Sequence, residues 1–143
     1  MTKALVCGDR RWENYYIIHS TLERFQKELG LDVIIHGNAV NPMRGDWRWK
    51  SADRIGGMAG QDLGMEEVKY TAEWNKYGIK AGPIRNKKML DENPDIVIVL
   101  AFHPNIRESK GTKMTINLAL DRGLRVLLFD DDGQEKEITE KIA

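Results

Sequence analysis

Short apolar runs recur along this chain, and each passes into a glycine or a polar turn before a helical segment follows. The run at 3–7 ends at Gly8, the run at 32–36 ends at Gly37, and the run at 95–102 is apolar on both faces. Strands of this kind, alternating with helices, pair in parallel through right-handed crossovers. The sequence therefore predicts an α/β fold, a three-layer sandwich around a central, mainly parallel sheet.

Glycines and apolar spacing set the bounds of the individual elements. Gly30 and Gly123 follow two amphipathic segments, as helix stops do. The acidic tail at 130–143 is predicted to form a turn with a short terminal helix or strand. The predicted strands are 3–7, 32–36, 67–71, 95–102 and 124–129, and the predicted helices are 16–29, 52–63, 84–90 and 112–121.

Length, charge and cysteine content limit the class of protein. A chain of 143 residues fits a single domain, 1–143. Because 22 basic residues balance 22 acidic ones, no overall field favours nucleic acid or a membrane surface. The single Cys7 precludes an internal disulfide and favours a reducing compartment. No apolar run approaches the ~20 residues that span a bilayer, so we expect a cytoplasmic protein.

Three loops follow predicted strands and are expected to meet at one edge of the sheet. They are 8–12, 36–39 and 109–112. Ligands of parallel α/β sheets bind beyond the carboxyl ends of the strands, and the first turn of a helix offers free N–H groups to anions. Arg10 and Thr112 would contact a phosphate there. The alternatives are an ordinary turn with surface arginines and a threonine that caps its own helix.

The segment Ala81 to Leu90 carries the strongest anion signal. Pro83 has the fixed backbone angle of a first helical turn, and Arg85 follows it by two residues. The guanidinium is a planar, permanently charged fork that suits phosphate or carboxylate. With the three loops, this segment predicts an anionic, nucleotide-like small-molecule ligand.

Two further side chains have a functional and a structural interpretation. His36 would hydrogen-bond a ribose or a base, or it is a histidine satisfied by backbone. Glu73 would contact a ribose diol or act as a general base, or it faces solvent. Three histidines and one cysteine lack zinc-type spacing, and 109–112 lacks the spaced glycines of a Walker loop, so we expect neither a metal nor a cofactor.

Basic residues alternate with tryptophans in the segment 43–50. This pattern would stack bases and neutralise the phosphates of a single strand. Alternatively, Trp47 and Trp49 cap a core, line a small pocket or form a subunit contact. The neutral charge of the chain favours these alternatives over nucleic acid, and we expect a homo-oligomer.

Several of these motifs together resemble the YspA/YpsA-related, DUF2493-like branch of the SLOG superfamily, which includes the LOG phosphoribohydrolases and the DprA proteins. The resemblance implies a Rossmann-like fold and binding of nucleotides or their derivatives. In LOG-like members it implies hydrolysis of the N-glycosidic bond of a nucleoside 5′-monophosphate. The motifs are Gly8 to Trp12, His36 to Ala39, Ala52-Asp53, Ala72 to Trp74, Ala81 to Asn86 with Met89, and Gly111-Thr112.

The chain departs from the LOG pattern at three places. Thr115 stands where that pattern has a glutamate, and 103–108 replaces its preceding glycines. The segment 40–50 is an insertion relative to the related chains. A non-catalytic sensor or sequestering protein for a nucleotide-derived signal is therefore the alternative to a hydrolase, and a DprA-like single-strand binder is the third.

The candidate site residues follow from the loops, the Arg85 segment and the resemblance. The candidate catalytic residues are Arg85, Glu73 and Asp53, and the candidate ligand-binding residues are Gly8, Arg10, Trp12, His36, Gly37, Asn38, Pro83, Arg85, Asn86, Gly111 and Thr112.

Overall fold

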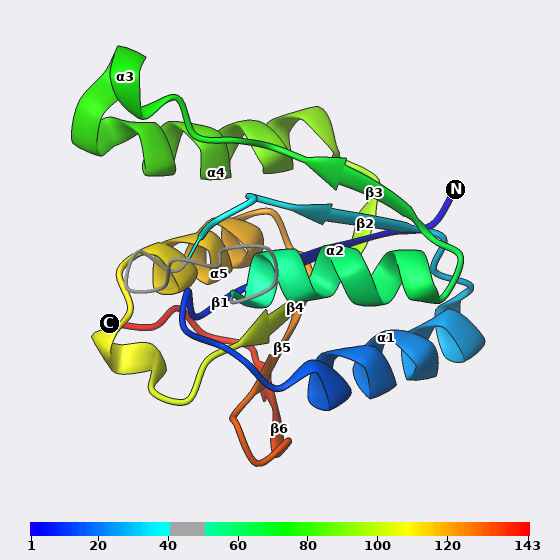
Figure 1. The fold of residues 1–143 in the computed structure, drawn as a ribbon. Coiled ribbons are helices and arrows are strands. Elements are labelled where there is room, and N and C mark those ends of the chain that lie inside the picture. The colour runs from blue at the N-terminus through cyan, green and yellow to red at the C-terminus, as the bar shows by residue number, and fades with distance from the viewer. Residues whose placement is uncertain (41–50) are drawn as a thin grey trace.

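A computed structural model, which describes residues 1–40 and 51–143, places all six of its strands in one sheet with the order β3-β2-β1-β4-β5-β6. Helices separate the first five strands along the chain (Figure 1). The elements are β1 Lys3–Gly8, α1 Tyr15–Leu29, β2 Val33–His36, α2 Ala52–Asp62, β3 Glu66–Lys69, α3 Trp74–Tyr77, the 3-10 helix η1 Gly78–Lys80, α4 Ala81–Glu92, β4 Ile96–Phe102, the 3-10 helix η2 Ile106–Glu108, α5 Gly111–Asp121, β5 Arg125–Phe129 and β6 Glu135–Ile138.

Five of the strands run parallel, as the sequence predicts, and β6 pairs antiparallel with β5 at one edge. The strand order changes direction between β1 and β4, because the chain builds outward through β2 and β3 and then returns to the other side of β1. Such a reversal leaves a crevice at the carboxyl ends of the two strands, where open α/β sheets bind their ligands.

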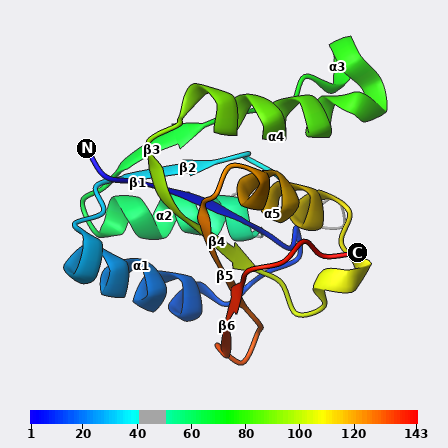
Figure 2. The ribbon, with the colours of Figure 1, turned by 180° about the vertical axis from the view of Figure 1, so that it is seen from behind.

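Two hydrophobic clusters cover the two faces of the sheet. Ile18 and Phe25 of α1 and Ile55 of α2 pack with one face, whereas Met89 of α4 and Ile116 of α5 pack with the other. Figure 1 views the side of α1 and α2, and in Figure 2 the opposite side brings α5 to the front. The predicted three-layer α/β sandwich is confirmed, and its topology is Rossmann-like.

The glycines of α2 have a packing function. A Cβ atom at Gly56 would lie 2.6 Å from Cγ1 of Val6, and one at Gly60 would lie 2.8 Å from Cγ1 of Ile34. Both partners are fully buried residues of the sheet. The helix therefore approaches the sheet so closely that the sequence accepts glycine despite its poor helix propensity.

The differences from the predicted elements lie mainly between β3 and α4. β3 ends at Lys69 rather than at Thr71, and α4 begins at Ala81, three residues before the predicted start. Pro83 lies in the first turn of α4, where its missing N–H costs no hydrogen bond. The short helices α3 and η1, which occupy 74–80, have no counterpart among the predicted elements.

In the tail, β6 realises the strand alternative of the prediction. The predicted insertion at 40–50 and the two tryptophans at 47 and 49 lie almost wholly outside the described residues, which resume at 51. Among the described helices, none is both long and apolar enough to cross a membrane.

Candidate functional site

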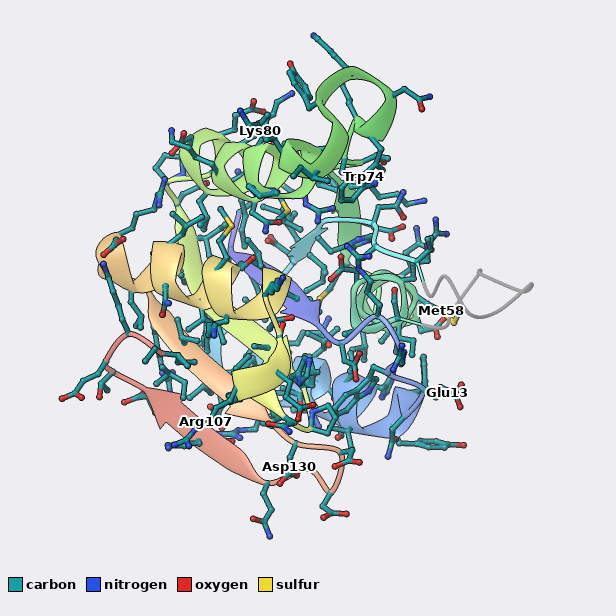
Figure 3. The ribbon with its side chains drawn as sticks, turned by 90° about the vertical axis from the view of Figure 1, so that its left-hand side faces the viewer. Glu13, Met58, Trp74, Lys80, Arg107 and Asp130 are labelled. Atoms are coloured by element: carbon teal, nitrogen blue, oxygen red, sulfur yellow. The ribbon has the colours of Figure 1, made fainter. Side chains whose placement is uncertain are left out.

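A cavity of about 580 Å³ opens at the carboxyl ends of β1, β2 and β4, over the point where the strand order reverses. Its volume falls within the range of roughly 300 to 1,000 Å³ that is usual for small-molecule sites. The three loops that the sequence singled out all contribute to its wall. Figure 3 looks onto this edge of the sheet. The lining residues are Cys7, Gly8, Asp9, Arg10, Arg11, Gly37, Ala39, Asp53, Arg85, Asn86, Met89, His103, Pro104, Asn105, Glu108, Ser109, Lys110, Gly111, Thr112 and Thr115.

Gly8, the last residue of β1, pairs with Phe102 of β4 and lines this cavity. A Cβ atom at Gly8 would lie 2.1 Å from the carbonyl oxygen of Phe102, so a side chain does not fit there. Its φ of 154° is also a value that residues with side chains rarely adopt. The next residue, Asp9, donates its backbone N–H to the same carbonyl at 2.8 Å. Glycine at this position therefore allows the loop to turn into the site directly at the strand end.

Arg85 extends from α4 into the cavity and is held by neutral acceptors. Its Nε donates to Oδ1 of Asn86 at 2.8 Å, and its Nη1 donates to the carbonyl oxygen of Gly37. Partial burial lowers the pKa of Arg85, while the charge of Asp53 opposes that shift. The guanidinium stays protonated, because arginine is not deprotonated in proteins. A fixed positive charge therefore faces the cavity.

Asp53 is the buried carboxylate of the site, with an exposed fraction of 6%. It lies in the first turn of α2, and its Oδ2 accepts a hydrogen bond from the backbone N–H of Ala39 at 3.0 Å. Ser51 caps the same helix end and donates its hydroxyl to the carbonyl oxygen of Ala39 at 2.6 Å. These bonds attach the loop after β2 to the start of α2.

The first turn of α5 forms the opposite wall. Ser109, not Thr112, provides the cap, because Oγ of Ser109 accepts the backbone N–H of Thr112 at 3.0 Å. Gly111 lies at the helix start and is exposed to the cavity. Thr115 also lines the cavity, but its hydroxyl donates to the carbonyl oxygen of Gly111 at 3.1 Å.

The cavity contains charged side chains that lack ion-pair partners within the described part of the chain. Four cations line it, and no carboxylate among residues 1–40 and 51–143 lies within ion-pair distance of any of them. Asp9 instead accepts the backbone N–H of Arg11 at 3.0 Å. Such a set of cations is available to an external anion. The four are Arg10, Arg11, Arg85 and Lys110.

His103, which the sequence analysis did not select, also lines the cavity. Its Nδ1 accepts the backbone N–H of Asn105 at 2.9 Å, so Nε2 carries the proton of the neutral ring. Burial lowers the pKa of His103, although Asp9 and Glu108 act in the opposite direction. The signal that would have found it is its position directly after β4, the same criterion that selected Gly8.

Cys7 lines the cavity from β1, but its chemistry is that of a core thiol. Burial, with the charge of Asp53, raises the pKa of the Cys7 thiol far above its ordinary value. A protonated thiol is a poor nucleophile. Cys7 therefore contributes packing rather than covalent chemistry at neutral pH.

Four of the candidate ligand-binding residues are not part of the lining. Trp12 is 3% exposed and packs edge-on against Phe102, and Pro83 lies on the exposed side of α4. His36 is fully buried, and its Nε2 lies 2.6 Å from Oε2 of Glu67. Asn38, with a φ of 55°, donates its backbone N–H to Nδ1 of His36. His36 thus takes the structural alternative that the sequence left open.

Glu73 and Asp53 lie in different cavities. Glu73 lines a smaller cavity of about 230 Å³ at the end of β3, together with Tyr70 and Tyr77. Arg85 lines both cavities. Of the three candidate catalytic residues, the larger cavity therefore combines Arg85 with Asp53 and leaves Glu73 outside.

One group of carboxylates within the described chain has the spacing of a metal site, and it lies away from both cavities. It consists of the exposed turn Asp130, Asp131 and Asp132 between β5 and β6. Oδ1 of Asp130 accepts hydrogen bonds from the backbone N–H groups of Asp132 and Gln134. These two bonds account for the presence of Asp130 in the turn.

The fold and the cavity together define a Rossmann-like α/β protein with a polar cavity at the carboxyl ends of its strands. The chain is similar to the Gene 61 protein of Mycobacterium phage D29, with 28% identity over 135 residues that cover 92% of this chain and 98% of the phage protein. Neither a family model nor a solved structure matches the chain.

Proposed function

We propose that this protein binds a phosphorylated nucleotide or nucleotide derivative in the larger cavity, with the anionic group at Arg85. The observation that carries the proposal is the burial and hydrogen bonding of Arg85. Its partly buried guanidinium is bonded to two neutral oxygens, and no described carboxylate pairs with it. A partly buried charge without a close ion-pair partner is costly even with Asp53 nearby, and a bound phosphate would offset that cost.

The surroundings of Arg85 support an organic phosphate rather than a bare ion. The first turn of α5 lines the same cavity, and Arg10 and Lys110 add two more cations. A volume of about 580 Å³ exceeds what a single phosphate fills. The resemblance of the motifs to the YspA/YpsA-related SLOG branch supports a nucleotide as the ligand.

Binding without turnover fits the carboxylates better than hydrolysis does. Cleavage of an N-glycosidic bond needs a carboxylate that stabilises an oxocarbenium-like centre or activates water. Thr115 replaces the glutamate of the LOG pattern, and its hydroxyl is engaged by Gly111. A sensor or sequestering protein is therefore our first choice.

Hydrolysis remains the second candidate because Asp53 lines the same cavity as Arg85. In that case the Asp53 carboxylate would take the catalytic role. The third interpretation, a DprA-like strand binder, depends on the segment 43–50 outside the described residues.

The test is to incubate the purified protein with a panel of nucleoside 5′-monophosphates and to follow two signals. Native mass spectrometry measures the retained intact nucleotide, and chromatography measures released base. Retention without base release supports the sensor. Base release that Asp53→Asn abolishes while retention persists supports the hydrolase. Neither retention nor release for any member of the panel would refute the proposal.

A further inference from the structure

Trp74 presents an unusually open aromatic ring near the larger cavity. The residue is 48% exposed, whereas Trp12 is 3% exposed. One edge of the indole rests on α4, because a Cβ atom at Gly82 would lie 3.4 Å from its ring carbon Cη2. Figure 3 labels Trp74 at the edge of the sheet that holds the carboxyl ends of the strands. The ring is therefore supported at one edge by α4, and Arg10 lies over its face.

Arg10 connects that face to the cavity. Its guanidinium carbon lies 6.0 Å from the centroid of the Trp74 ring, and the same residue lines the cavity wall. An exposed cation–π contact is weak, and stacking of a nucleobase on an aromatic ring is stronger. A base can therefore displace Arg10 from the ring face. Arg10 can then contact a phosphate instead of the ring.

The spacing between Trp74 and the anion-binding groups suits an elongated ligand. Trp74 follows β3, whereas the first turn of α5 follows β4, and β2 and β1 lie between them in the sheet. Neighbouring strands are about 4.8 Å apart, so the ends of β3 and β4, from which these two segments lead, are separated by roughly 14 Å. A nucleoside monophosphate has an extended shape of this kind, with an anion at one end and a flat heterocycle at the other.

We infer that Trp74 is the stacking platform for the aromatic heterocycle of the ligand. The inference rests on the proposed function, since it assigns the second end of the same nucleotide. Arg10 lies over the ring and turns to the ligand's phosphate when the heterocycle takes its place. Trp74 thereby selects nucleotides over sugar phosphates, which share the anion but lack the ring.

Isothermal calorimetry with AMP and with ribose 5-phosphate tests this role. The wild type should bind AMP at least about tenfold more tightly than ribose 5-phosphate, the lower range of one stacked base. Trp74→Ala should reduce the AMP affinity to that of ribose 5-phosphate and leave ribose 5-phosphate binding unchanged. Trp74→Phe, which keeps a ring, should retain the preference. Circular dichroism confirms that each variant is folded.

The outcomes separate this inference from the proposed function. If the wild type binds both ligands and Trp74→Ala weakens both equally, or neither, the stacking role is overturned while phosphate binding stands. If the wild type binds AMP no more tightly than ribose 5-phosphate, the stacking role also fails. If it binds no phosphorylated ligand at all, the proposed function fails and the subsite with it.

Discussion

At the scale of single residues, Gly37 and Arg85 depend on each other. A Cβ atom at Gly37 would lie 2.7 Å from the Cζ and Nη1 atoms of Arg85, so any side chain there displaces the guanidinium. The displaced group is the far end of a flexible side chain, and the backbone need not move. Gly37 is therefore the residue that allows Arg85 to approach the end of β2.

We predict that Gly37→Ala lowers the affinity for a nucleoside monophosphate by about tenfold, the equivalent of one lost hydrogen bond to a charged group. The unfolding free energy should change by less than about 1 kcal/mol. Calorimetry and urea unfolding measure the two quantities. The control is a double mutant: once Arg85→Ala is present, Gly37→Ala should cost no further affinity. Additive losses would show that Gly37 acts independently of Arg85.

The pair His36 and Glu67 makes a second residue-scale prediction, this one about pH. The hydrogen bond from His36 is the main cause that lowers the pKa of Glu67 below its ordinary value of 4.5. A lowered carboxylate pKa adds stability that is present above pH 4.5 and is lost as the pH falls through the folded-state pKa. The unfolded chain takes up the proton first, so acid favours unfolding.

Glu67→Gln should therefore reduce the unfolding free energy at neutral pH by about 1.5 to 3 kcal/mol and flatten its decline below pH 5. Urea unfolding at a series of pH values provides the measurement. Glu66→Gln is the matched control, because Glu66 is the exposed neighbour on β3. Equal acid dependence in both variants would contradict the assignment of this decline to the buried pair.

At the scale of elements, the glycines of α2 are visible in the sequence, but the reason for them is not. Apolar spacing predicted a helix, and Gly56, Gly57 and Gly60 argued against it. The reason for two of these glycines lies on another element, in Val6 of β1 for Gly56 and in Ile34 of β2 for Gly60. Local sequence carries no record of such contacts.

We predict that Gly56→Ala destabilises the protein by about 1 to 3 kcal/mol, because its methyl group overpacks a fully buried part of the sheet. Gly111→Ala is the control, since a Cβ atom there meets no other atom within 4 Å and the residue begins a helix. Urea unfolding of the two variants should show a loss only for Gly56→Ala. A stabilised Gly56→Ala variant would mean that α2 lies farther from β1.

The elements that sequence reasoning missed are those without a periodic pattern of their own. α3 and η1 together span 74–80 and are too short for helical spacing to appear. The contact of His36 could not be predicted, because its partner Glu67 lies 31 residues away and is brought to it only by the pairing of β2 with β3. A contact of this type cannot be read from either segment alone.

At the scale of the whole molecule, the fold was predictable because each level of the sequence agrees with it. Two-sided apolar runs, glycines at strand ends and intervening amphipathic segments all favour the same parallel sheet. The strand order then places Gly8, Gly37 and Gly111 at one cavity. Of the remaining candidates, Asp53 lines this cavity and Glu73 lines the neighbouring one. This difference depends on the placement of α3 and α4.

The central claim is that Arg85 holds the phosphate of a nucleotide, and a paired titration tests it most directly. Calorimetry compares AMP with adenosine, which lacks the phosphate, on the wild type, Arg85→Ala and Arg107→Ala. Arg107 is the matched control, an exposed arginine on η2 that does not line the cavity.

We expect Arg85→Ala to lower the AMP affinity roughly tenfold to a hundredfold, as loss of a charge-assisted contact does, toward that of adenosine. Arg107→Ala should bind AMP as the wild type does. Equal AMP affinities for Arg85→Ala and Arg107→Ala would contradict the claim.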